Sequence, residues 1–321
     1  MKSELRVVLF FLVAFSVSVV HAQTYPSRPI RILVPLAPGG GMDGIARGVA
    51  QSLTDSVGQT VVVDNRPGAG SQLSLQILAN GAPDGHTLMM MSANTVIHPL
   101  LYPAQSRFDI VRDFTPVSQL TAQGFALVVH PSLPVKTTLE FVNYAKANPG
   151  KLNYASSGIG SPNHMTTELF QAATGTRVNH IPYTGMGAAY TDLIGGRINL
   201  SFAAVNAAQQ HVNAGRLRML AVTPGKRMPA APDIPTLKEG GVPVEVVNWY
   251  GLIAPKGVPR AVNEKIAAEV TKSVRSPEMT KRLVGDGSEG VGSTPAEFAT
   301  HIRAEYALWS KVIKQAGIKG E

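Results

Sequence analysis

Three glycines near the N-terminal end of the chain have the spacing of a phosphate-binding loop. Gly39, Gly41 and Gly44 match the pattern G-x-G-x-x-G, and Asp64 follows Gly44 by twenty residues. In dinucleotide-binding proteins such a loop holds the pyrophosphate at a helix N-terminus, where free N–H groups and the helix dipole favour an anion. The sequence therefore predicts an anion-holding loop, and a nicotinamide-dependent enzyme is one interpretation of it.

Other features of the same region disfavour a dinucleotide. Asp43 places a carboxylate inside the loop, four residues before Arg47, which is the spacing of a helical ion pair. Pro35 and Pro38 stiffen a segment that would have to turn tightly. Residues 1–22 have the character of an export signal, and a diffusible nicotinamide is not expected outside the cytoplasm. We therefore predict that the protein uses no cofactor.

Serine and histidine side chains indicate a second possible chemistry, the hydrolysis of esters. Ser157 and His164 lie in a stretch rich in serine and glycine, but residues 156–160 lack the glycine that precedes the serine in G-x-S-x-G. The eight histidines show neither H-x-x-x-H nor H-E-x-x-H spacing, so no metal site is predicted. An exported serine hydrolase of α/β type remains the alternative function.

The first 22 residues predict export. Lys2 and Arg6 supply positive charge, Val7–Val20 is an apolar core, and a small residue precedes the expected cleavage site before Gln23. We predict a periplasmic protein with a cleaved signal peptide at residues 1–22, and an uncleaved membrane anchor is the alternative. The absence of a twin-arginine pair indicates export in the unfolded state.

The charge distribution disfavours nucleic acid as a partner. The whole chain carries +8 and residues 1–22 contribute +1, which leaves +7 on the mature chain. Lysines and arginines do not form a run interleaved with aromatic residues, as a nucleic-acid surface would require. A moderately basic exported protein can attract anionic solutes. The roughly 300 mature residues are enough for two domains, and the lack of cysteine excludes disulfides.

The glycine loop belongs to a set of alternating strands and helices. Short apolar runs predict buried strands at Ile30–Val34, Val61–Asp64 and Thr87–Met91, and helices are expected at Ile45–Val57 and Ser71–Asn80. The carboxyl ends of neighbouring parallel strands share one edge of a sheet, where ligands bind. We expect one crevice there, lined by the loops Gly39–Gly41, Gly70–Ser71 and Ser92–Asn94.

A second set of strands and helices follows residue 116. Separate strands are predicted at 117–120 and 125–129, and a helix at 138–147 is expected to turn Leu139 inward. Later loops rich in serine, threonine and glycine again follow strands. We therefore predict an α/β fold of two lobes whose strand ends form the two walls of a cleft. The predicted boundaries are residues 23–122 plus 248–321 for lobe 1 and residues 123–247 for lobe 2.

Distinctive short motifs occur in order along nearly the whole mature chain. They are Tyr25–Ile30, Pro38–Gly40 with Asp43 and Ala46–Arg47, Asn65–Gly70, Ala82–Gly85, Asp113–Val117, Pro182–Gly185, Asp192–Gly196 and Pro232–Thr236. In these motifs the sequence resembles the Bug family, the periplasmic solute-binding receptors of tripartite tricarboxylate transporters. The resemblance implies a periplasmic-binding-protein fold of the Venus flytrap kind (type II-like), with a ligand cleft and without catalysis.

The resemblance also implies the ligand, the partners and the site. A small carboxylate would be held by backbone N–H groups, hydroxyls and ordered waters, then passed to the permease subunits of the transporter or to a sensor by a monomeric receptor. The matching positions are Pro38, Gly39, Gly40, Met42, Asp43, Ser71, Gln72, Ser92 and Asn94 in lobe 1, Ser157, Ser161, His164, Thr184, Gly185, Met186 and Asn206 in lobe 2, and Trp249 near the crossing.

Two departures from the family pattern bear on the ligand. The family usually has Gly-Asn where this chain has Ser71 and Gln72, and Lys-Gly-Ser near residues 184–188, where this chain has Met186. Losing the lysine makes that rim less positive, while methionine adds an adaptable apolar surface. We therefore expect a ligand with one carboxylate and a bulkier or less charged remainder.

Overall fold

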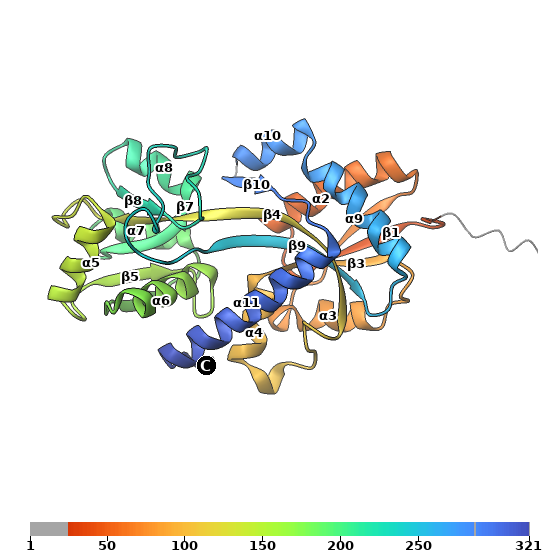
Figure 1. The fold of residues 1–321 in the computed structure, drawn as a ribbon, viewed down its shortest axis with the longest axis horizontal. Helices are drawn as coiled ribbons and strands as arrows, with labels where there is room; N and C mark the ends of the chain where they lie inside the picture. The colour runs from red at the N-terminus through yellow and green to blue at the C-terminus, as the bar shows by residue number, and fades with distance from the viewer. Residues whose placement is uncertain (1–24, 286, 321) are drawn as a thin grey trace, which may run out of the picture.

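Two long antiparallel strands, β4 (Phe114–Val129) and β9 (Val247–Pro255), run side by side from one α/β lobe to the other (Figure 1). This computed structural model describes residues 25–285 and 287–320, so the predicted signal peptide, residues 1–22, lies outside the described residues. Within those two ranges no helix has the length and apolar character to span a membrane. The predicted two-lobed α/β architecture is confirmed.

Lobe 1 is built on short parallel strands, of which β1 (Ile30–Val34) and β3 (Thr87–Ser92) are largely buried on both faces. β1 lies between β2 (Val61–Asn65) and β3. Ile32 packs with residues of α2 on one face, and Leu33 packs with α3 and α4 on the other. The helices of this part are α2 (Gly41–Val57), α3 (Gln72–Ala79) and α4 (Ala93–Leu101), with the 3-10 turns η1 (Ala69–Ser71) and η2 (Pro103–Gln105).

Lobe 2 continues the sheet on the other side of β4. The strand order there is β4-β7-β5-β6, and β8 also pairs with β4. Because β5 and β6 are parallel, the loops that follow them lie at the same edge of the sheet. The elements are α5 (Thr138–Ala147), β5 (Asn153–Ser156), α6 (Pro162–Thr174), β6 (Asn179–Pro182), α7 (Met186–Ile194), β7 (Leu200–Ala204), α8 (Val205–Asn213) and β8 (Arg218–Val222).

The chain returns to lobe 1 through β9 and ends in helices. β10 pairs antiparallel with β4 at Thr121–Gln123, close to the point where β4 leaves lobe 1. The last helix contacts α4 and β4 and also reaches α6 of lobe 2 (Figure 1). These elements are α9 (Arg260–Val274), α10 (Pro277–Gly285), β10 (Ser288–Gly290) and α11 (Pro295–Ala316).

Three local predictions are wrong, each for a physical reason. Helix α2 begins at Gly41, four residues earlier than predicted, because the end of the glycine loop itself forms the first helical turn. β4 is one strand, since residues up to Gly124 pair with β9 and residues from Phe125 pair with β7 and β8. Leu139 is 58% exposed because Phe141, which is fully buried, takes the inward position of α5.

Candidate functional site

The loop between β1 and α2 is closed by a carboxylate of the chain itself. The Oδ2 atom of Asp43 accepts a hydrogen bond from the backbone N–H of Gly39 at 3.0 Å and another from Nε of Arg47 at 2.9 Å. The Oδ1 atom accepts from Nδ2 of Asn65 at 3.0 Å. The hydrogen bond from Arg47, followed by those from Gly39 and Asn65, lowers the pKa of Asp43 to about 2 against the effect of burial. The predicted Asp43–Arg47 pair is confirmed.

These contacts remove the basis for a dinucleotide site. The N–H of Gly39 that would face a pyrophosphate already donates to Asp43, whose negative charge would repel a phosphate. Asp64, which would have to bind a ribose, forms ion pairs with Arg31 and Arg66 instead. The loop does hold an anion, as predicted, but the anion is a side chain of this protein.

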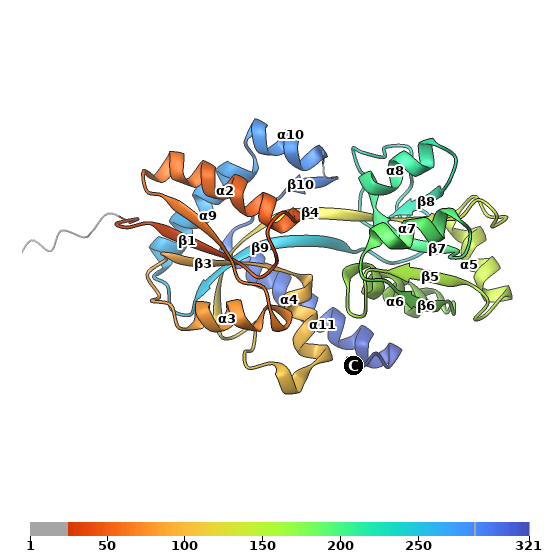
Figure 2. The ribbon, with the colours of Figure 1, turned by 180° about the vertical axis from the view of Figure 1, so that it is seen from behind.

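The loop between β5 and α6 presents serines toward lobe 1. Ser161 caps α6, and its hydroxyl donates to Oδ1 of Asn163 at 2.7 Å or to the carbonyl of Gly158 at 2.6 Å. The hydroxyl of Ser157 also donates to Asn163 Oδ1, at 3.0 Å. Asn163 is buried, so the amide oxygen of one buried side chain holds the hydroxyls of both serines. Figure 2 shows this loop facing α4 across the space between the lobes.

Two stacked histidines lie behind that loop. The rings of His164 and His180 are parallel to within 5°, with centroids 4.0 Å apart, and Tyr154 stacks on His180 at 4.8 Å. Nδ1 of His164 accepts the backbone N–H of Gly160 at 2.9 Å. Burial, with a smaller contribution from His180, lowers the pKa of His164 to about 4, so this imidazole is neutral at pH 7.

A cavity of about 380 Å³ lies where the two lobes meet. Its walls come from loops after β1 and β2, from α4 and from the β5–α6 loop, and none of its lining residues is Asp, Glu, Lys or Arg. The lining residues are Pro35, Leu36, Ala37, Pro67, Gly68, Gly70, Ser71, Asn94, Ile97, His98, Leu101, Tyr102, Ser157, Ile159, Gly160 and Ser161.

Four predicted site residues, Ser71, Asn94, Ser157 and Ser161, line this cavity together. Sequence reasoning missed the apolar and aromatic wall contributed by α4, which includes His98 and the adjoining Tyr102. A helix of the sequence Ala-Asn-Thr-Val-Ile-His-Pro-Leu-Leu has no motif that marks one face as a ligand wall. The only signal was that the helix follows a predicted strand end.

Other predicted residues lie on exposed strand-end loops outside the cavity wall. Pro38, Gly39 and Gly40 follow β1, and Thr184 and Gly185 follow β6. A Cβ atom placed on Gly39, Gly40 or Gly185 would meet no heavy atom within 4 Å. These loops are therefore open to solvent at the same strand edges that carry the cavity.

Four other predicted site residues are buried within the protein. Met42 is 1% exposed, and Trp249, also 1% exposed, donates from its indole nitrogen to Glu305 at 3.0 Å. The backbone N–H of Ser92 donates to the hydroxyl of Thr95 at the start of α4. His164 is 4% exposed, does not line the cavity and contacts two residues that do, Gly160 through its ring and Ser161 through its backbone N–H.

Three further predicted residues contact protein groups away from the cavity. Gln72 accepts from the backbone N–H of Arg107 at 3.3 Å. The sulfur of Met186 lies 2.8 Å from Nδ2 of Asn163. Met186 therefore contacts the residue that holds the serine loop, and it does not line the cavity. Asn206 donates from Nδ2 to the carbonyl of Val284 at 3.1 Å, which joins α8 of lobe 2 to α10 of lobe 1.

No serine of this region has the geometry of a hydrolase nucleophile. Ser157 is exposed, but its hydroxyl donates to Asn163 and not to a histidine. Ser156 lies 2.6 Å from Nε2 of His180, but it is 0% exposed and no substrate could reach it. Within residues 25–285 and 287–320, no group of three His, Asp or Glu side chains could hold a metal ion.

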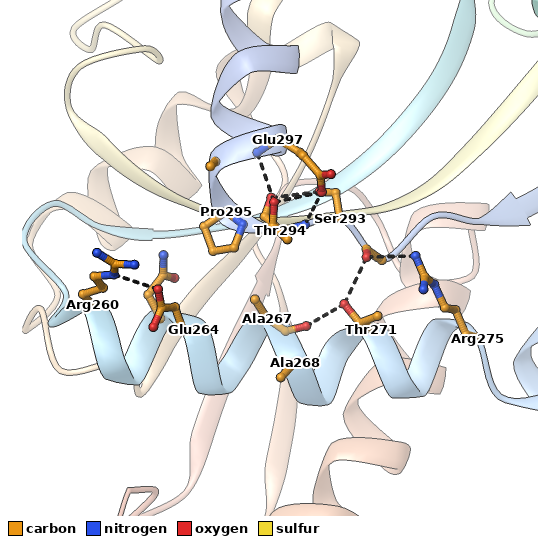
Figure 3. Close-up of a pocket in the computed structure, with 13 residues that line it drawn as sticks. Arg260, Glu264, Ala267, Ala268, Thr271, Arg275, Ser293, Thr294, Pro295 and Glu297 are labelled. Carbon is orange, nitrogen blue, oxygen red and sulfur yellow. Dashed lines mark hydrogen bonds and ion pairs between the residues drawn. The ribbon is translucent and has the colours of Figure 1, made fainter.

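A larger groove of about 970 Å³ lies on lobe 1 alone, between α9 and the segment that enters α11 (Figure 3). Its charged side chains are already engaged: Arg260 donates to Glu264 at 2.7 Å, and Arg275 donates to the carbonyl of Val291 at 2.8 Å. The carboxylate of Glu297 accepts from the N–H of Thr294 at 2.8 Å. Since one lobe supplies every wall, the smaller cavity between the lobes is the candidate ligand site.

Comparison with known proteins identifies the family. The model of the tripartite tricarboxylate transporter family receptor, TctC, matches residues 45–318. The chain belongs to this family. It is 34% identical over 313 residues to the protein BugT of Bordetella pertussis, covering 97% of this chain and 96% of BugT. The resemblance to the Bug family inferred from the sequence motifs is therefore confirmed.

Two solved structures of similar proteins contain carboxylates. A protein of R. palustris, solved with adipate, is 34% identical with a TM-score of 0.75 and covers 92% of this chain and 99% of its own. MatC from Rhodopseudomonas palustris, with bound malate, is 28% identical with a TM-score of 0.72 and covers 90% and 100%. The predicted fold class, that of periplasmic solute-binding receptors, is confirmed, and the family consists of receptors and not of enzymes.

Proposed function

We propose that this receptor binds a small acid with one carboxylate between its lobes and delivers it to the membrane components of a tripartite transporter. The observation that carries the proposal is the cavity between the lobes, which has hydroxyl and amide groups on some walls, apolar groups on α4 and no charged side chain. The similar proteins solved with adipate and malate support a carboxylate as the ligand.

The polar walls suit one carboxylate. Asn94 lies in the first turn of α4 and Ser161 is the N-cap of α6, so two helix N-termini meet at the cavity. Free N–H groups and the helix dipole stabilise an anion at such ends. The hydroxyls of Ser71 and Ser157 lie on the same cavity walls and add hydrogen-bonding groups.

The rest of the cavity suits an uncharged body. Ile97 and Leu101 of α4 and Ile159 of lobe 2 all line it, and no lysine or arginine lines it to balance a second carboxylate. Burying an unpaired charge is unfavourable, whereas burying apolar surface is favourable. The apolar residues of α4, and not Met186, therefore support the preference for a less charged ligand.

We propose that the lobes close on the ligand by a hinge in β4 and β9, without catalysis. The boundaries remain residues 23–122 plus 248–321 and residues 123–247. They are supported by the change of strand partners between Gly124 and Phe125, since a strand that changes partners there can bend with little loss of pairing. Export through residues 1–22 and a monomeric state complete this proposal.

A thermal-shift screen of the ligand-stripped protein tests this function. We expect hexanoate or benzoate to raise the melting temperature more than succinate, adipate, citrate or NAD. A ligand at a hundred times its Kd adds about 2.7 kcal/mol of stability, a shift of a few degrees. No shift with any acid, or turnover of p-nitrophenyl acetate that Ser157→Ala abolishes, would contradict the proposal.

A pair of variants locates the site. Asn94→Ala should weaken binding of the best acid by about tenfold or more, because a hydrogen bond to a charged group contributes about 1.5–3 kcal/mol. Asn80→Ala is the matched control. Asn80 is also exposed, but it is the C-cap of α3, at the end of that helix opposite to the cavity residue Ser71. Equal affinities of the two variants, measured by calorimetry, would place the ligand elsewhere.

A further inference from the structure

A buried imidazole holds the middle of the loop that forms the lobe 2 wall of the cavity, while Asn163 holds its two serines. The backbone N–H of Gly160 donates to Nδ1 of His164, so Nδ1 carries no proton and Nε2 carries the proton. Gly160 has φ of +74° and lies against Leu101 of lobe 1, where a Cβ atom would come within 2.6 Å of Leu101 Cδ1. The hydrogen bond to His164 thus holds the loop at a point where it lies against the opposite lobe.

The surroundings of His164 disfavour a charged ring. His180, from β6, stacks on it at 4.0 Å, and Tyr154, from β5, lies beyond at 6.3 Å. Among the described residues, the carboxylate that faces this ring is that of Glu168, one turn along α6. Its Oε1 atom lies 3.9 Å from Nε2 of His164. That oxygen already accepts from the hydroxyl of Tyr154 at 2.6 Å, and burial raises the pKa of Glu168.

We propose that His164 is a positioning residue for the ligand: its neutral imidazole holds the loop 157–161 in the cavity wall, and protonation releases that loop and with it the ligand. An imidazolium has no lone pair at Nδ1 and cannot accept the N–H of Gly160. Two imidazoliums stacked at 4.0 Å would also repel each other across a buried contact. The inference rests on the proposed function, because it concerns the wall of the same cavity.

The direction of the pH effect follows from the ring environment. Burial lowers the pKa of His164 to about 4 and also lowers the pKa of His180 below its usual 6.5. Both rings are therefore neutral at pH 7.5, and His164 gains its proton toward pH 4. The loop should be held at neutral pH and released progressively in acid.

Amide hydrogen exchange followed by mass spectrometry tests the loop without any ligand. After correction for intrinsic rates, we expect protection of a peptide spanning 156–161 to fall at least tenfold between pH 7.5 and 4.5, while the strand 200–204 stays protected. His164→Ala should lose this protection at both pH values. His164→Asn should restore it at both, because Oδ1 of asparagine can accept the N–H of Gly160 and does not titrate.

Two controls make the outcome specific. His211→Asn changes another histidine of lobe 2, whose ring lies tilted against Tyr190 on α7 and not against the loop, so it should keep the wild-type pH dependence. Equal protection of the wild-type loop at both pH values, or wild-type pH dependence in His164→Asn, would overturn the inference.

Calorimetry with hexanoate separates this inference from the proposed function. After correction for the fraction of hexanoate that is itself protonated, we expect the Kd for the ionised acid to rise as loop protection falls and to be less dependent on pH in His164→Asn than in wild type. A loop that opens in acid without changing the Kd would overturn the role in ligand positioning. No binding of hexanoate or benzoate at any pH would instead count against the proposed function, while the exchange data would still decide the role of His164.

Discussion

At the scale of single residues, Gly70 fixes the position of a cavity side chain. Gly70 has φ of +58°, and a Cβ atom placed on it would lie 2.0 Å from Cδ2 of His98. The ring of His98 stacks on Tyr102 at 4.8 Å on α4 and its C-cap. Glycine is therefore required twice at this position, for the backbone angle and for the close approach of the imidazole.

We predict that Gly70→Ala destabilises the protein by about 2–5 kcal/mol. A left-handed non-glycine residue costs about 1–2 kcal/mol, and displacing a packed side chain adds about 1–3 kcal/mol. Gly215→Ala is the matched control, since Gly215 has φ of +68° with no heavy atom within 4 Å of its Cβ position, and it should lose only the backbone part. Equal losses in urea unfolding would mean that His98 moves freely.

Single residues also mark the limit of what the sequence reveals. Ser157 and Ser161 were predicted from the resemblance to the Bug family, which agreed with a polar loop after a predicted strand, and both line the cavity. His98 and Tyr102 could not, because only tertiary packing of α4 brings them to the cavity. Trp249 shows the converse: it lies on the crossing strand β9, as predicted, but its side chain points into the core and donates to Glu305.

At the scale of elements, the turn from β1 into α2 depends on Asp43. Its carboxylate ties together the loop at Gly39, the helix at Arg47 and the end of β2 at Asn65. Removing it would take one acceptor from each of these three donors, although Nδ2 of Asn65 would still donate to the carbonyl of Leu36. We predict that Asp43→Ala destabilises the protein by about 1–3 kcal/mol at pH 7, as expected when buried hydrogen-bonding groups lose a partner.

Acid should remove the same contribution from the wild type. The folded-state pKa of Asp43, about 2, lies below the ordinary value of 3.8, so its stabilising effect is complete above about pH 4 and is lost as pH falls toward 2. The stability difference between wild type and Asp43→Ala, from urea unfolding, should therefore shrink between pH 5 and pH 2.5. Asp55→Ala, at the exposed end of α2, is the control, and a difference that does not vary with pH would contradict this role.

Helices and strands could be predicted where their own sequence pattern determines them, but not where pairing with other strands determines them. The buried run Ile30–Val34 and the helix Thr138–Ala147 form as expected. The early start of α2 was hidden because glycines weaken the helical signal, although Asp43 compensates by closing the turn. The continuity of β4 could not be seen in its sequence, because different partner strands hold its two halves.

At the scale of the whole molecule, the lobes touch at a second place besides the cavity. Asn206 of α8 donates to the carbonyl of Val284 in α10, and Lys226 of lobe 2 pairs with Glu289 of β10 at 3.0 Å. Figure 1 shows α10 and β10 beside α8. Since β10 pairs with β4 at Thr121–Gln123, these contacts connect lobe 2 to the proposed hinge.

A disulfide across this contact tests whether the lobes must move for ligand exchange. A Cβ atom on Gly287 would lie 3.0 Å from Cγ of Asn206, within reach of a bond whose Cβ atoms stand about 3.5–4.5 Å apart. The chain has no cysteine, so Asn206→Cys with Gly287→Cys would supply its only two thiols. Cysteine at φ of +70° costs about 1–2 kcal/mol, which a disulfide contributing about 2–4 kcal/mol offsets.

We predict that the oxidised double variant exchanges hexanoate at least tenfold more slowly than the same protein after reduction, measured by stopped-flow fluorescence of its tryptophans. The tether holds α8 and α10 together, so β4 and β9 cannot bend to separate the cavity walls. Reduction provides the control within one sample, and Gly287→Cys alone shows the effect of the backbone strain. If oxidised and reduced proteins exchange the acid at the same rate, then opening at this contact is not needed for the ligand to enter or leave, and the hinge must be sought elsewhere.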